Sequence, residues 1–155
     1  NFKTFMTGEV FNSFTENTIL SSSVNYVEFN DKYKTSFING VNQIKEGSSL
    51  INAAFKIRTN DLFNKMSKED NYHFLSGLLI GEELLKLDLS DTKKIIVYAN
   101  PQLTKIYTTA LKYLETNEEI ICVPAKKLAK IQVLGQFKIY QQFSLEKSHP
   151  SNYEV

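Results

Sequence analysis

The stretch "HFLSGLLIGEELL", from His73 to Leu85, has the apolar content of a buried helix but contains two glycines, Gly77 and Gly81. A glycine inside a helix costs about 1 kcal/mol relative to alanine. Residues four positions apart share one face of a helix, so this pair leaves a face that another backbone can approach closely. Tight packing of the helix on a sheet is one explanation for the glycines, and contact of the helix with a ligand is the other.

Capping signals place the start of this helix. Ser67 is followed by Glu69 and Asp70, a pattern typical of a helix N-terminus. The serine hydroxyl can accept a first-turn N–H, and the carboxylates favour the positive end of the helix dipole. We therefore expect the helix to begin after Ser67 and to run to about Leu87.

Three more helices are expected before Ser67. Apolar residues keep a helical spacing in each, and Gly47 is typical of a helix C-terminus. The predicted segments are a helix over 8–20, a loop over 21–25, helices over 33–46 and 48–58, and a turn over 59–66.

The last third of the chain alternates between strand and helix signals. The predicted segments are a strand over 93–99, a helix over 102–114 with Asn100 as its N-cap, a strand over 118–123 and a helix over 125–143. Connections this short imply a parallel strand pair with a right-handed crossover. Two parallel strands need further cover on both faces. We therefore predict a helix-rich α/β domain over residues 1–145 with an incomplete sheet, followed by a polar tail over 146–155.

Composition limits the class of function. The 155-residue chain has a net charge of +1, which does not favour nucleic acid or an anionic membrane as the main partner. No apolar run approaches the roughly 18 residues that cross a bilayer. The single cysteine, Cys122, lies in the apolar run "EIICV" and is expected to be a buried strand thiol. We expect a cytoplasmic protein, without a metal site built from its two distant histidines, His73 and His149.

Three places carry side chains that suit a binding site. Asn100 follows a predicted strand, where parallel sheets bind ligands, although an ordinary strand-to-helix turn explains it as well. Thr7 begins "TGE", which offers a hydroxyl, a glycine and a carboxylate, or simply an N-cap. Arg58 is the only arginine among 18 basic residues, which indicates a place where a planar fork is required, a structural ion pair or chance. Glu82 and Glu83 are most simply solvated, and a position facing a cleft is the alternative for one of them.

Three stretches, taken together and in order, resemble one enzyme family. They are "FKTFMTGEVF", "LFNKMSKEDNYHFLSGLLIGEEL" and "KKIIVYANPQLTKIYTTAL", and they resemble the C-terminal half of the 2-dehydro-3-deoxygalactonokinase family. The resemblance extends from Phe2 to about Tyr140, and "FLSGLLIGEEL" is its most specific part. The segment "FKIRTNDLF" also matches the family's arginine-containing segment.

The resemblance implies a fold and a reaction. The family belongs to the sugar-kinase, Hsp70 and actin superfamily, in which two ribonuclease-H-like lobes close over ATP and substrate. It implies phosphorylation of the 6-hydroxyl of 2-dehydro-3-deoxy-D-galactonate with ATP and Mg²⁺. This chain resembles the C-terminal part of the second lobe, so its implied partners are the sugar acid and the missing N-terminal lobe. A homodimer is a further expectation.

The resemblance also implies roles for individual residues, while the catalytic residues stay unknown. The residues expected near the sugar acid are Thr7, Glu9 and Arg58, and those expected near ATP are Gly8, Ser76, Gly77, Gly81 and Asn100. The chain departs from the family at Ala99-Asn100-Pro101, where a glycine-containing turn is usual. Lys126 and Lys127 open the last predicted helix, as solvated lysines or as phosphate contacts. A non-catalytic sensing or interaction domain derived from such a kinase is the alternative.

Overall fold

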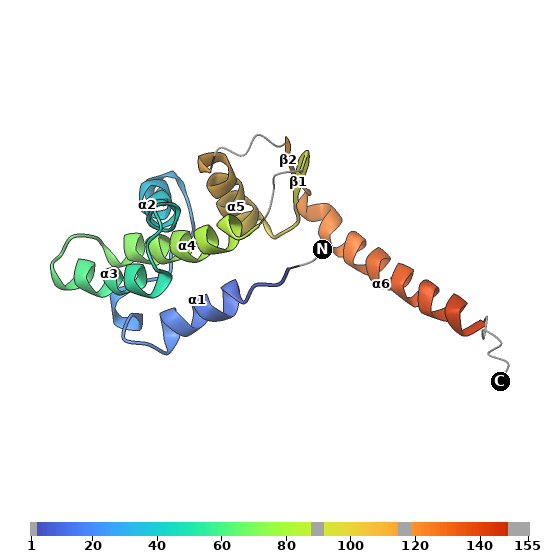
Figure 1. Ribbon diagram of the computed structural model, residues 1–155, viewed down its shortest axis with the longest axis horizontal. Coiled ribbons are helices and arrows are strands. Elements are labelled where there is room, and N and C mark those ends of the chain that lie inside the picture. Colours follow the sequence, from blue (N-terminus) through green and yellow to red (C-terminus); the bar gives the residue numbers. More distant parts are fainter. Residues whose placement is uncertain (1–2, 88–91, 115–118, 149–155) are drawn as a thin grey trace.

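Six helices, two short 3₁₀ turns and two strands make up the described part of the chain. The computed structural model describes residues 3–87, 92–114 and 119–148. The elements are α1 (Thr7–Glu16), η1 (Ser21–Ser23), η2 (Asp31–Tyr33), α2 (Lys34–Lys45), α3 (Leu50–Leu62), α4 (Lys68–Leu85), β1 (Lys94–Val97), α5 (Pro101–Tyr113), β2 (Glu119–Cys122) and α6 (Ala125–Ser148) (Figure 1). The predicted helix-rich domain with a parallel strand pair is confirmed.

Helix α4 is the centre of the packed helices α1 to α5, which are called the helical body below. Ser67 caps it as predicted, since its Oγ accepts the Asp70 N–H at 3.0 Å. The helix carries apolar residues on every side, a pattern that requires cover all around. Helices α1, α2, α3 and α5 all contact it, and it is buried along most of its length.

The glycines of α4 admit helix α2. A Cβ on Gly77 would lie 2.0 Å from the Phe37 carbonyl oxygen, and one on Gly40 of α2 would lie 2.2 Å from the Phe74 carbonyl oxygen. A Cβ on Gly81 would lie 3.1 Å from the Cα of Val41. The expectation of helix–sheet packing is therefore wrong, because the close neighbour of both α4 glycines is the backbone of another helix.

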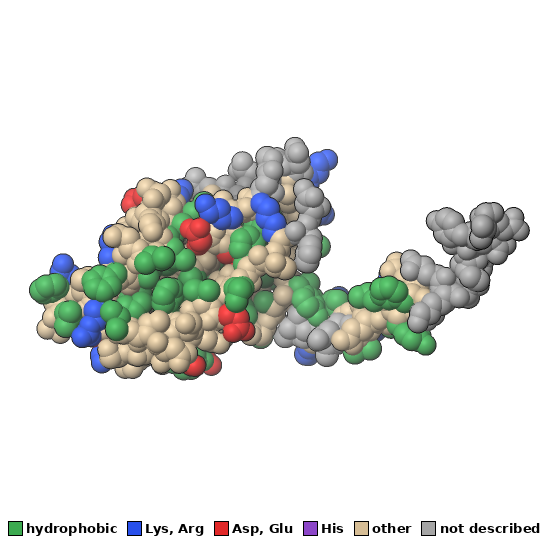
Figure 2. All heavy atoms as spheres, turned by 60° about the horizontal axis from the view of Figure 1, so that its bottom comes forward, with side chains coloured by type: hydrophobic (Ala, Val, Ile, Leu, Met, Phe, Trp, Pro, Cys, Tyr) green, Lys and Arg blue, Asp and Glu red, His purple; other side chains and the backbone are tan. Residues whose placement is uncertain are grey.

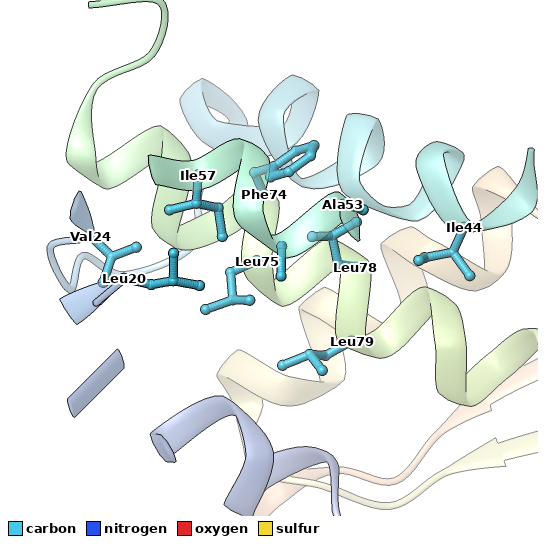
Figure 3. Close-up of a cluster of buried hydrophobic side chains, with 10 residues drawn as sticks. Leu20, Val24, Ile44, Ala53, Ile57, Phe74, Leu75, Leu78 and Leu79 are labelled. Atoms are coloured by element: carbon cyan, nitrogen blue, oxygen red, sulfur yellow. The ribbon is translucent and has the colours of Figure 1, made fainter. Parts of the chain in front are cut away.

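Two apolar clusters lie on the two sides of α4. One fills the space between α4, α3 and the segment that follows α1, where Leu75 and Ile57 are fully buried (Figure 3). The other joins α2, α4, α5 and β1, and its buried residues are Phe29, Phe37, Val41, Ile80, Leu84, Val97, Ala110 and Leu111. The strand pair therefore packs on the helical body through Val97 of β1, which lies in the same cluster as residues of α5.

The strands pair in parallel, with Lys94 opposite Glu119 and Val97 opposite Cys122. Val97 is the only buried residue of the two strands. Cys122 is exposed and lies 3.4 Å from the Thr108 hydroxyl, so the expected buried thiol is wrong. The physical reason is that the described elements leave that side of β2 uncovered.

Several predicted boundaries are corrected. Helix α1 ends at Glu16 rather than near residue 20, and Thr7 is its first residue, not its cap, which is Met6. Helix α3 continues to Leu62, through part of the expected turn. Asp61 stabilises this extra turn because its carboxylate accepts the Ser23 hydroxyl at 2.8 Å.

The C-terminal helix differs most from the helical body. Helix α6 continues to Ser148, beyond the predicted end at residue 143, and the rest of the predicted tail lies outside the described residues. It extends away from the other helices (Figure 1) and carries exposed apolar side chains along its length (Figure 2). None of the helices in the described ranges is long and apolar enough to cross a membrane.

Candidate functional site

A cavity of about 420 Å³ lies between the start of α1, residues 26–29, α4 and the start of α5. It brings together four of the residues singled out from the sequence: Thr7, Gly8, Ser76 and Asn100. Its apolar lining includes Phe11, Leu79, Ile80, Leu103 and Ile106. A mostly apolar wall with a few polar groups is typical of sites for small organic ligands.

Two helix N-termini reach this cavity. Asn100 caps α5 as predicted, because its Oδ1 accepts the Leu103 N–H at 2.9 Å and Pro101 occupies the first helical position. The N-cap residue of helix α1, Met6, makes no side-chain cap, so the backbone N–H groups of the first turn lack that partner. The positive ends of both helix dipoles therefore lie beside one cavity, an arrangement that suits an anionic ligand such as phosphate.

Glu83 links the helices that form the cavity. Its carboxylate accepts hydrogen bonds from the Thr7 hydroxyl of α1 and, at 2.9 Å, from the Tyr107 hydroxyl of α5. The expectation that Glu83 is solvated is wrong, since it is half-buried. Burial, together with this carboxylate, raises the pKa of Tyr107, so its hydroxyl stays a donor at neutral pH. The local pattern does not tell Glu83 from Glu82, because the two adjacent glutamates look alike in it.

His73 lies at the buried side of the cavity. It is 1% exposed and packs against the rings of Phe29, Tyr33 and Tyr72 at centroid distances of 4.9 to 5.4 Å. Burial lowers the pKa of the imidazole, and interactions with the Val27 backbone and Asp70 offset only part of that effect. His73 is therefore neutral at neutral pH. Neither ring nitrogen meets the geometry of a hydrogen bond in the described structure.

A second hollow, of about 880 Å³, lies at the carboxyl ends of the two strands. Ala99 and Pro101 line it after β1, and Val123 and Pro124 line it after β2. Three lysines, Lys34, Lys105 and Lys112, are also part of its wall. The crevice expected at this edge of the sheet is therefore present, and Asn100 separates it from the smaller cavity.

The other predicted site residues lie elsewhere. Glu9 is exposed on α1, and Gly77 and Gly81 face α2. Arg58 lies between α3 and η1, where its guanidinium is 3.5 Å from the Asp61 carboxylate and 3.2 Å from the Ser23 hydroxyl. The ion-pair interpretation of Arg58 accounts for these contacts. Lys126 and Lys127 are exposed and line neither hollow.

Comparisons with known proteins identify what the chain is similar to. Residues 1–131 match the family described as 2-keto-3-deoxy-galactonokinase. The Rhizobium meliloti (strain 1021) protein DgoK1, assigned as a 2-dehydro-3-deoxygalactonokinase, is 34% identical over 84 residues, which are 54% of this chain and 28% of the relative.

A solved structure resembles most of the chain. It is the crystal structure of a protein from Sinorhizobium meliloti assigned as a 2-dehydro-3-deoxygalactonokinase, with a TM-score of 0.72 and 27% identity. The match covers 84% of this chain and 42% of that protein. The chain therefore spans less than half the length of either relative.

Proposed function

Since the chain belongs to the 2-keto-3-deoxy-galactonokinase family, we propose that it is the C-terminal lobe of an ATP-dependent sugar-acid kinase. The reaction is phosphorylation of the 6-hydroxyl of 2-dehydro-3-deoxy-D-galactonate during galactonate breakdown in the cytoplasm. The fold proposed for the complete lobe is the ribonuclease-H-like fold of the actin-type ATPases. Its sheet would be completed by strands outside these 155 residues.

The observation that carries this proposal is the convergence of two helix N-termini on the 420 Å³ cavity. Phosphoryl transfer depends on positioning and on neutralising phosphate charge, and backbone N–H groups at helix starts supply both. We assign Gly8, Ser76 and Asn100 to the nucleotide side of the cavity and Thr7 to the side of the sugar acid. Glu9 is assigned to the substrate side from the family resemblance alone.

The residues present fit a nucleotide. The cavity falls within the roughly 300–1,000 Å³ of small-molecule sites, and its apolar wall from α1 and α5 suits a base. The Asn100 Oδ1 caps its own helix, so the side chain would offer ATP its Nδ2 donors rather than its oxygen. ATP supplies the phosphoryl group, and Mg²⁺ would be held mainly by its phosphates, since the described residues include no cluster of three or more metal-binding side chains.

The proposed partner is the N-terminal part of the same kinase. Ile96 and Tyr98 of the β1 segment are 64% and 45% exposed, and the apolar residues of α6 are exposed as well. Exposed apolar surface on this scale favours burial against a partner. We expect the N-terminal lobe and the remaining strands of this lobe to cover it, with a second copy of the chain as the alternative occupant.

The direct test is a phosphorylation assay of the full-length protein. We expect ATP-dependent phosphorylation of 2-dehydro-3-deoxygalactonate, with weaker activity on other 2-keto sugar acids, and no turnover by the 155-residue chain alone. The absence of product from every sugar acid, combined with retained ATP or sugar-acid binding, would establish the non-catalytic sensor instead. The altered turn at Ala99-Asn100-Pro101 is the feature that favours that second candidate.

Arg58 provides a sharper test of the substrate side. The proposal that its guanidinium binds the substrate carboxylate predicts that Arg58→Lys lowers kcat/KM far more than it lowers the melting temperature. Asp61→Asn is the matched control, because it breaks the ion pair but keeps the arginine. If both variants lose activity only in proportion to stability, Arg58 is a structural residue.

A further inference from the structure

We propose that Glu83 is a positioning residue that holds the N-termini of α1 and α5 in place around the 420 Å³ cavity. The consequence for ATP rests on the proposed function, whereas the consequence for the order of α1 does not. Glu83 itself does not line the cavity, but both of its partners, Thr7 and Tyr107, do. Its role is therefore to place other groups and not to touch the ligand.

The contacts of Glu83 join three helices. Its carboxylate belongs to α4, the central helix. It accepts one hydrogen bond from the hydroxyl of Thr7, the first residue of α1, and one from the hydroxyl of Tyr107, in the middle of α5. No lysine or arginine of the described residues forms an ion pair with it. The two hydroxyl donors therefore provide the hydrogen bonds of a half-buried charge, which makes both of them strong.

Helix α1 depends on this link more than the other helices do. None of its residues is buried, and its half-buried apolar residues, Val10, Phe11 and Phe14, come after the first turn. Its first turn has no side-chain cap. Just before α1, Lys3 Nζ also donates a hydrogen bond to the Lys86 carbonyl at 2.8 Å, next to the Thr7–Glu83 hydrogen bond.

The same carboxylate fixes the other side of the cavity. Tyr107 lies two turns after Asn100 on α5, so its bond to Glu83 limits rotation of that helix about its own axis. Pro101 has no N–H and the Leu103 N–H is bonded to Asn100, so the Gln102 N–H of α5 and the first N–H groups of α1 must face one space to bind the same anionic ligand. A displacement of either helix start by about 1 Å is enough to weaken such a site.

The test compares two neighbouring glutamates in the chain. Glu83→Ala removes the link, and Glu82→Ala is the matched control, since Glu82 has only a surface ion pair with Lys86 at 3.8 Å. Glu83→Gln keeps an acceptor oxygen. By hydrogen exchange, we expect Glu83→Ala to raise the exchange rates of the α1 amides by about tenfold, Glu83→Gln by much less, and Glu82→Ala not at all. The amides of α2 and α3 should exchange as in the unchanged protein.

ATP binding gives the second readout. In the full-length protein, we expect Glu83→Ala to raise the KM for ATP about tenfold while kcat changes little, and Glu83→Gln to restore most of the affinity. If Glu83→Ala does not fold, Thr7→Val and Tyr107→Phe remove the two hydrogen bonds separately with smaller changes of shape. Each should then raise exchange in its own helix alone.

The outcomes separate this inference from the proposed function. Unchanged exchange in α1, or an equal rise in all helices, would overturn the positioning role whatever the affinity for ATP. If exchange in α1 rises as expected but the unchanged full-length protein binds no ATP, the link stands and the proposed kinase function fails. If ATP binds and its KM does not respond to Glu83→Ala, the role in the site is overturned.

Discussion

The helical body and the C-terminal α6 contain similar apolar residues, but these residues are buried in the helical body and exposed in α6. Phe37 of α2 is 0% exposed, whereas Phe137 of α6 is 53% exposed. The difference does not come from composition. Helix α4 has apolar residues on all sides and finds a partner helix on each of them, whereas the described residues provide no such partners for α6. Burial follows from the presence of a complementary surface, and only the helical body contains its own.

The largest expected effect tests the close packing within the body. Gly77→Ala should lower the free energy of unfolding by at least about 3 kcal/mol or prevent folding, because the added Cβ would meet the Phe37 carbonyl at 2.0 Å. The control is Gly135→Ala in α6, where nothing lies within 4 Å and the change should be neutral or stabilise by up to about 1 kcal/mol. Urea denaturation measures both. Equal, small effects would mean that α2 and α4 are not in close contact.

A buried amide provides the next largest effect. Asn71 is 0% exposed, and its Nδ2 donates to the carbonyls of Ser23 at 3.2 Å and Ile57 at 3.3 Å. Asn71→Ala leaves these carbonyls without this donor and should cost about 2 kcal/mol. Gln136→Ala on the exposed face of α6 is the control and should change stability by less than about 0.5 kcal/mol. A loss below about 0.5 kcal/mol for Asn71→Ala would contradict its place in the body.

The pH dependence of stability tests the aromatic surroundings of His73. Burial lowers the pKa of His73 from 6.5 in the folded state, so the unfolded chain binds the proton more readily. The stability that neutral His73 contributes is present above pH 6.5 and is lost as the pH falls through the folded-state pKa. We expect the free energy of unfolding to decrease as the pH is lowered from about 7.5 to about 4.5.

A variant pair assigns that pH dependence. His73→Phe keeps an aromatic ring between Phe29 and Tyr33 and should flatten the curve below pH 6.5. His149→Gln removes the other histidine of the sequence and should leave the curve unchanged. An unchanged slope in His73→Phe would show that another group is responsible for it.

The smallest effect is expected in α6. Leu134 and Phe137 are 49% and 53% exposed, so replacing both with serine should change the stability of the helical body by less than about 0.5 kcal/mol. Leu78→Ala in the core is the comparison and should cost about 3 kcal/mol. Chemical denaturation followed by Tyr fluorescence measures both. A comparable loss in the α6 variant would mean that α6 packs on the body.

Local signals predicted the elements well. The Ser67 and Asn100 caps, Pro101 at a helix start and Gly47 at a helix end all stand where expected. Such signals work because the donor and the acceptor lie within a few residues of each other. The predicted helix ends were wrong where a residue distant in the sequence stabilises the end of the helix. In the last turn of α3, for example, Asp61 accepts a hydrogen bond from Ser23.

The candidate site was predicted only in part. Thr7, Gly8, Ser76 and Asn100 line one cavity, whereas Arg58 lies at η1 and Glu9 is exposed on α1. Tyr107 was missed, and Glu83 was named only as one of two glutamates that are solvated or face a cleft, since nothing within a helical turn of either residue distinguishes it. Their importance depends on a carboxylate and a hydroxyl 24 positions apart in the sequence.

By itself, the sequence determined that α4 is a capped, apolar helix with a face bare enough for close approach. These properties follow from spacing and hydrogen bonds along one segment. Only the tertiary structure decided that α2 fills this face through Gly40, that Cys122 is exposed and that Glu83 joins α1 to α5. The physical reason is that a contact between distant segments depends on both surfaces, and one segment's pattern describes only its own.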